Sequence, residues 1–157
     1  MTKKIISLIL SLILAISCVP LSVFASGNDE TITTTSNVAI CVESTWCNAG
    51  KYAEVNINIL DNPGIAGAKF SVSYDKGLTL MSVAEDDGVF KELDYTAPET
   101  LTSPALFNWD SLDAVADEDG TIITLKFAVS NSVTVGDNLD VKVSYTYGDI
   151  YDFNLKS

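Results

Sequence analysis

Two clusters of acidic residues have the spacing that comes nearest to catalytic or metal-binding chemistry. They are Glu85-Asp86-Asp87 and Asp117-Glu118-Asp119. A glycosidase needs two carboxylates about 5–10 Å apart on either side of a sugar, and carboxylates adjacent in sequence do not supply that geometry. The clustered oxygens also suit Ca²⁺, but Asp119-Gly120 is typical of a hairpin turn. We therefore predict solvated acidic turns, with no catalytic residues and no metal site.

The overall composition removes other kinds of chemistry. The 157 residues include 21 Asp and Glu, nine lysines, no arginine and no histidine, and the net charge is −12. Without histidine, Ser-His and Cys-His nucleophile pairs and the commonest metal ligand are excluded. An acidic chain without a basic stripe is a poor match for the phosphates of nucleic acid. Hydrophobic residues make up 47% of the sequence, so we expect one globular domain rather than a disordered acidic chain.

Two tryptophans raise the alternative of a carbohydrate-binding surface, because aromatic rings stack on sugar rings. Trp109 lies two positions after Phe107 in a predicted strand, so both side chains point to the same side, and we expect both in the core. Trp46 lies in a turn and is free to be exposed. A sugar platform normally needs two or three aromatic rings in line, and Trp46 alone does not make one.

The first 25 residues have the layout of a secretory signal peptide. Lys3 and Lys4 precede an almost entirely apolar run over residues 5–19, and Pro20 and a small residue, Ala25, follow. We expect cleavage after Ala25 and a secreted, extracellular protein. Two alternatives are an uncleaved membrane anchor and a lipoprotein attached at Cys18. Cleavage leaves seven lysines against 21 carboxylates, a net charge of −14.

Two cysteines remain after cleavage. An exported protein allows Cys41 and Cys47 to form a disulfide, although the loop between them is small and its entropic gain modest. The alternative is a pair of free thiols near a turn. Two cysteines without histidine are a poor zinc site.

Residues 26–36 are small, polar and rich in threonine, and we expect a flexible leader there, followed by one domain over residues 37–157. Apolar residues then recur at every second position, and turn residues such as Asp61-Asn62-Pro63-Gly64 separate the runs. No segment shows a sustained period of 3.6 residues, and residues 84–104 allow only a short edge strand or a loop. About eight strands, each apolar on one face, predict an all-β fold, an antiparallel β-sandwich. The inward positions are Val38, Ile40, Val42, Val55, Ile57, Ile59, Phe70, Val72, Tyr74, Leu78, Leu80, Val83, Phe107, Trp109, Ile123, Leu125, Phe127, Val129, Val141, Val143, Tyr145 and Tyr147.

A series of short motifs resembles the cohesin domain of bacterial cellulosome scaffolds. In cohesins a turn of the Asn-Pro-Gly-Ile-Ala type leads into a strand that ends in a Tyr-Asp pair. The resemblance extends from about Val38 to Asn154, and the order of the motifs is more specific than any one of them. In order along the chain they are Asn62-Pro63-Gly64-Ile65-Ala66, Tyr74-Asp75, Leu78-Thr79-Leu80, Phe107-Asn108-Trp109-Asp110, Asp119-Gly120-Thr121-Ile122 and Gly148-Asp149-Ile150.

The resemblance implies a jelly-roll-like sandwich of nine strands and a non-catalytic role. Cohesins dock a dockerin, a calcium-loaded module carried by secreted glycoside hydrolases, so the calcium would belong to the partner and the chain needs no cofactor. The family usually adds a last strand beside the first one. The sequence ends at Ser157, before any such strand. Two alternatives are that the sequence is a fragment and that the final strand is lost, and in either case we expect the first strand to have an open edge.

In the family one flat sheet face contacts the dockerin. Here that face would be formed by the third strand, the strand of Phe107 and the strand of Val141. Alternation predicts its outward side chains to be Lys69, Ser71, Ser73, Asn108, Lys142, Ser144 and Thr146.

Two positions on the third strand depart from the family. Cohesins place an Asn and an Asp there as recognition residues, and this sequence has Gly67 and Lys69 instead, so those roles are not carried over. A matching dockerin must present different chemistry, such as a carboxylate toward Lys69. Two alternatives from other classes are a carbohydrate-binding module on the same fold, which coplanar exposed aromatic rings would favour, and a cell-surface structural or adhesive domain.

Overall fold

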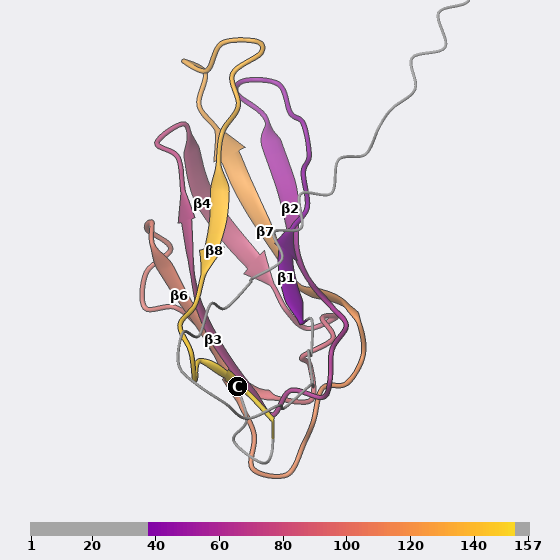
Figure 1. Cartoon of the computed structure of the whole chain (residues 1–157). Coiled ribbons are helices and arrows are strands. Elements are labelled where there is room, and N and C mark those ends of the chain that lie inside the picture. The colour runs from indigo at the N-terminus through magenta and orange to yellow at the C-terminus, as the bar shows by residue number, and fades with distance from the viewer. Residues whose placement is uncertain (1–37, 153–157) are drawn as a thin grey trace, which may run out of the picture.

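The computed structural model describes residues 38–152 and shows two antiparallel sheets facing each other (Figure 1). The predicted signal peptide over residues 1–25 and the leader over residues 26–36 lie outside the described residues, as do residues 153–157 at the end of the sequence. No helix within residues 38–152 is long and apolar enough to cross a membrane. The strands are β1 Ala39–Val42, β2 Tyr52–Leu60, β3 Gly67–Tyr74, β4 Leu78–Ala84, β5 Asp94–Thr96, β6 Ala105–Asp110, β7 Gly120–Val129, β8 Val141–Ser144 and β9 Ile150–Tyr151.

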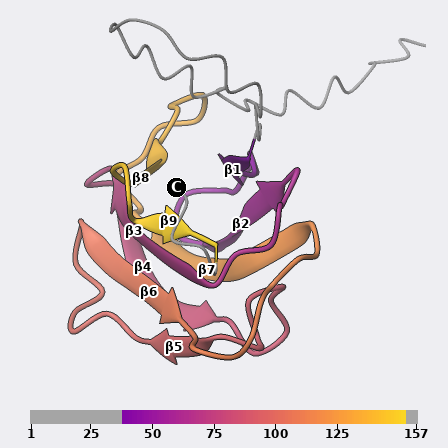
Figure 2. The same ribbon diagram turned by 60° about the horizontal axis from the view of Figure 1, so that its bottom comes forward.

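The strand order confirms the predicted β-sandwich. One sheet has the order β1-β2-β7-β4, and the other has the order β5-β6-β3-β8, with the short β9 also pairing with β3. Figure 2 shows β8, β3, β6 and β5 following one another along one layer. The irregular segment of residues 84–104 contributes β5, a short strand at the edge of its sheet, as expected.

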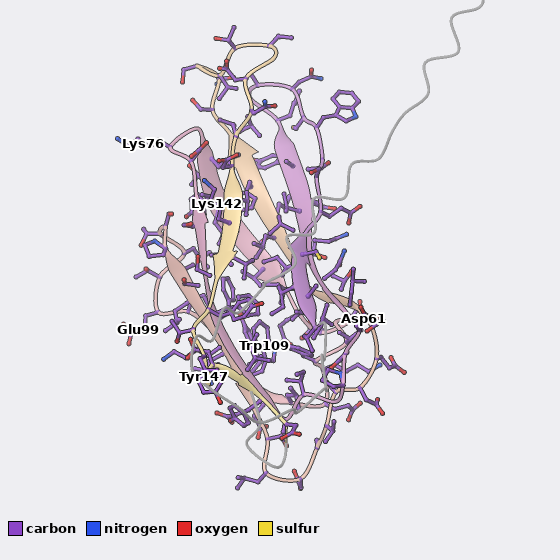
Figure 3. The ribbon with its side chains drawn as sticks, viewed as in Figure 1. Asp61, Lys76, Glu99, Trp109, Lys142 and Tyr147 are labelled. Carbon is purple, nitrogen blue, oxygen red and sulfur yellow. The ribbon has the colours of Figure 1, made fainter. Side chains whose placement is uncertain are left out.

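Period-two alternation places the core between the sheets. In β2, Ala53, Val55, Ile57 and Ile59 are buried, while the intervening side chains face outward. All described buried residues are apolar, so the interior is held together by the burial of hydrocarbon and aromatic surface. Trp109 is 1% exposed, which confirms its predicted place in the core (Figure 3).

An aromatic cluster surrounds Trp109. The rings of Phe70 and Tyr95 lie with centroids 5.2 and 5.0 Å from the Trp109 ring, and Phe90 packs edge-on at 5.7 Å. Such offset and edge-on contacts are the favoured geometries of aromatic pairs. The indole Nε1 of Trp109 and the hydroxyl of Tyr95 are buried without a hydrogen-bond partner among the described residues. The cluster ties β3, β5 and β6 together from beneath, which keeps their outer surface in place.

The predicted turn before β3 is locked by one side chain. Asn62 Nδ2 donates hydrogen bonds to the carbonyl oxygens of Ala116 at 3.1 Å and Glu118 at 2.9 Å, and its Oδ1 accepts one from the backbone N–H of Gly64. The backbone N–H of Asn62 donates in turn to Asp119 Oδ1. The Asn62 side chain therefore fastens the entry of β3 to the loop that connects β6 and β7.

Two expectations from the sequence are wrong in detail. Tyr147 is 88% exposed rather than buried, because β8 ends at Ser144 and a turn follows, so that strand alternation no longer applies. The alternative of a Cys41–Cys47 disulfide is also wrong, since Cys47 is a free thiol. Cys41 lies in β1 opposite Asn58 and is 4% exposed, whereas Cys47 lies in the loop that follows β1 and packs against the core.

Candidate partner-binding face

The three strands predicted to form the contact face are neighbours in one sheet, in the order β6-β3-β8. Register places Lys69 opposite Asn108, Ser71 opposite Ser144, and Ser73 opposite Lys142. Side chains directly opposite one another in paired strands point to the same side of the sheet. The structure therefore brings six of the seven predicted residues onto one surface. The seventh, Thr146, follows β8 and lines a hollow on the same surface.

The hollow lies near the middle of this surface and has a volume of about 180 Å³. Leu106 forms part of its wall and is 49% exposed, which makes it an apolar side chain in polar surroundings. Sequence reasoning missed Leu106, although alternation could have found it between the buried Ala105 and Phe107. The lining residues are Lys69, Phe70, Ser71, Leu106, Ser144, Tyr145, Thr146 and Asp149.

A tight turn after β8 shapes one side of the hollow. Asp149 Oδ2 accepts hydrogen bonds from the backbone N–H of Thr146 at 2.7 Å and from the Thr146 hydroxyl at 2.6 Å. These hydrogen bonds, with a smaller contribution from the positive charge of Lys69, hold the pKa of Asp149 below its usual value. The backbone N–H of Lys69 also donates to the Asp149 carbonyl oxygen at 2.7 Å, so the turn is attached to β3.

The two lysines of the face differ in their surroundings. Lys142 Nζ lies 2.9 Å from Asp140 Oδ2, and this contact raises the pKa of Lys142. Lys69 is exposed and forms no ion pair with any carboxylate of residues 38–152. Lys69 is therefore the lysine on this face whose charge is available to a partner.

At the other end of the face two carboxylates lie side by side. Asp94 in β5 is directly opposite Asp110 in β6, and both are exposed. Like charges in directly opposite positions destabilise a pair of strands. The described contact that moderates this repulsion is a 3.3 Å hydrogen bond from Asn108 Nδ2 to Asp110 Oδ2. Sequence reasoning did not identify this pair, because the register of a three-residue edge strand is not readable from the sequence.

The two acidic clusters lie in loops, one directly after β4 and the other directly before β7. Asp119 and the Glu118 carbonyl oxygen hold the Asn62 turn. Burial raises the pKa of Glu85, and the neighbouring Asp86 adds to the shift. Within the part of the chain that the structure describes, no three His, Cys, Asp or Glu side chains gather in a way that could hold a metal ion.

The sequence matches no protein-family model and no curated protein. The structure, however, is similar to the sixth cohesin of scaffoldin B from Acetivibrio cellulolyticus, with a TM-score of 0.64 at 18% identity over 73% of this chain and 86% of that one. The chain has the cohesin fold. This confirms the resemblance drawn from the motifs at the level of the fold, which is that of a non-catalytic binding module.

Two further structures show the range of proteins that share the cohesin fold. One is the third ScaC cohesin from Acetivibrio cellulolyticus, described in complex with the ScaB dockerin, with a TM-score of 0.55 and 25% identity over 61% of this chain and 72% of that one. The other is a non-cellulosomal cohesin from the archaeon Archaeoglobus fulgidus, with a TM-score of 0.52 and 15% identity over 69% and 72%. The fold thus occurs both in cohesins described in complex with dockerins and in one described as non-cellulosomal.

Proposed function

We propose that this chain is a secreted, non-catalytic module that docks a dockerin of a polysaccharide-degrading enzyme through the outer face of β6, β3 and β8. The observation that carries the proposal is the cohesin fold combined with a preformed polar face on those three strands. Cohesins of this fold are described in complexes with dockerins. The proposed extracellular location follows from the signal-peptide layout of the first 25 residues.

The physical character of the face suits docking of a rigid partner. Two of its strands, β3 and β6, are fixed from the core side by the aromatic cluster around Trp109, so little ordering is needed there on binding. A stable complex of ordinary size buries about 800 Å² on each partner. The exposed Leu106 and the hollow beside it supply an apolar centre within a polar surround, which is the usual arrangement of such interfaces.

A direct binding measurement tests the proposal. The exported chain is immobilised and exposed to purified dockerin modules encoded by the same organism, first with calcium and then with a chelator. We expect 1:1 binding of at least one dockerin that is lost with the chelator, because the calcium belongs to the dockerin. Absence of binding to every dockerin at about 10 µM, with circular dichroism showing a folded β protein, would overturn the proposal.

A further inference from the structure

The outer surface of β5, β6 and β3 carries three pairs of side chains of different chemical character in consecutive rows. The first row is acidic, with Asp94 beside Asp110. The second row holds Lys69 beside Asn108, and the third holds Leu106 beside Ser71. The order along the strands is therefore negative, positive and apolar.

The acidic row is a pair of charges that a cation would stabilise. Asp94 and Asp110 are exposed and directly opposite, and no lysine of residues 38–152 forms an ion pair with either carboxylate. A basic group placed between two carboxylates removes their mutual repulsion and gains attraction to both. The structure thus provides a place for a basic side chain of a partner at this end of the face.

The middle row requires the opposite charge. Lys69 is exposed and forms no ion pair with a described carboxylate. The carboxylate of Asp149, which lines the same hollow, accepts its hydrogen bonds from Thr146 instead. Lys142 does not compete for a partner's carboxylate to the same degree, since it is already paired with Asp140 at 2.9 Å. An incoming carboxylate is therefore directed to Lys69.

The third row accepts an apolar side chain. Leu106 is 49% exposed, and the hollow beside it is bounded by the Thr146–Asp149 turn and by Tyr145. Covering this leucine removes apolar surface from water, which favours association. A volume of about 180 Å³ is large enough to receive one aliphatic side chain.

The spacing of the rows is within about 1.2 Å of the pitch of a helix. Outward residues two positions apart on a strand are separated by about 6.6 Å, and successive turns of an α-helix by about 5.4 Å. We propose that the partner docks a helix along β6 that presents a basic, an acidic and an apolar side chain on successive turns, which contact the Asp94–Asp110 pair, Lys69 and Leu106 in that order. This inference rests on the proposed function and specifies the partner of the same face.

A pair of designed helical peptides tests the inference directly. One 21-residue peptide carries Lys, Glu and Leu at positions i, i+4 and i+7 of one face, and its twin carries Glu, Lys and Leu at the same positions. Binding to the exported chain is followed by NMR titration at low ionic strength. We expect the first peptide to bind about five- to tenfold more tightly, because two exposed charge contacts change sign between the peptides. Equal affinities, or no binding of either peptide at millimolar concentration, would overturn the inference.

Charge reversal in the chain provides the second arm. The double variant Lys69→Glu and Asp110→Lys should reverse the peptide preference, whereas the control double variant Lys51→Glu and Asp87→Lys, with the same charge changes away from the face, should retain it. Both variants are checked by thermal unfolding before use. A preference that survives reversal at Lys69 and Asp110 would contradict the proposed contacts.

The same variants separate this inference from the proposed function. If a dockerin binds the unmodified chain and the Lys69→Glu and Asp110→Lys reversals leave its affinity within twofold, the proposed function stands and the inference fails. If no dockerin binds but the peptide preference and its reversal are observed, the inference stands and the proposed function fails.

Discussion

The Asn62→Asp substitution tests the turn that positions β3, the central strand of the candidate face. The two side chains have nearly the same shape, but the carboxylate cannot donate the two hydrogen bonds that Asn62 Nδ2 makes to the Ala116 and Glu118 carbonyl oxygens. Two such bonds contribute about 1–3 kcal/mol. The new charge also faces both carbonyl oxygens and the nearby Asp119, so we expect the loss to reach about 3 kcal/mol.

Urea unfolding followed by circular dichroism measures this loss. With a slope of about 2 kcal/mol per molar urea, the midpoint at pH 7 should fall by about 1.5 M. Asn138→Asp is the matched control, because Asn138 is exposed and its side chain forms no described hydrogen bond, so its midpoint should change little. Equal shifts for the two variants would refute the account of the turn.

The pH dependence gives an independent check on the same variant. The charged form of the introduced carboxyl is disfavoured in the folded state, so its folded pKa is raised above its unfolded value. Protonation removes the charge and restores one donor. The deficit of Asn62→Asp relative to the control should therefore be largest at pH 7 and should shrink as the pH falls toward 4. A deficit that is constant over this range would indicate that loss of packing, not of hydrogen bonding, is the cause.

Three further predictions concern single side chains. Lys69→Glu should weaken dockerin binding about tenfold and Lys51→Glu less than twofold, measured by calorimetry, because only Lys69 lies on the candidate face; equal losses would refute the face assignment. Burial raises the pKa of Tyr95 to about 12, so the stability that depends on its neutral hydroxyl is fully present below pH 10 and should be lost between pH 10 and 12. In alkaline unfolding experiments Tyr95→Phe should not show this loss. The lowered pKa of Asp149 implies that the Thr146 amide shift, followed by NMR, titrates below pH 3.8, with the turn loosening as the pH falls through that pKa; a titration above pH 3.8 would contradict the hydrogen-bonded turn.

Much of the fold follows from alternation, as the long strands show. β2 and β6 bury the side chains expected of them, because each has one face in the core and the period of two is uninterrupted. In β7 the expected side chains are buried too, but a register shift in its pairing with β2 also buries Ile122 beside Ile123, which strict alternation does not predict. The prediction fails where the regular backbone ends. Tyr147 lies beyond the last residue of β8, where side chains no longer alternate between the two sides of a sheet, so its position in the sequence does not predict its burial.

The candidate site was predictable only in part. Alternation gave the outward residues of β3 and β8, and it would also have given Leu106 on β6. The facing of Asp94 and Asp110 depends on the register of a short edge strand, which tertiary contacts determine. That Cys47 does not pair with Cys41 likewise depends on how the loop between β1 and β2 folds, and their distance in sequence does not reveal it.

The burial of Trp109 also gives this molecule an internal optical probe. Trp109 is 1% exposed and Trp46 is 84% exposed, so an aqueous quencher such as acrylamide should suppress the emission of Trp46 and leave that of Trp109. Trp109 shares β6 with Leu106 and Asp110, whose side chains point to the opposite side of the sheet. The indole therefore senses the strand from the inside while any partner contacts it from the outside. The emission of Trp109 that remains after quenching can therefore report docking without a label, through changes in its wavelength and anisotropy.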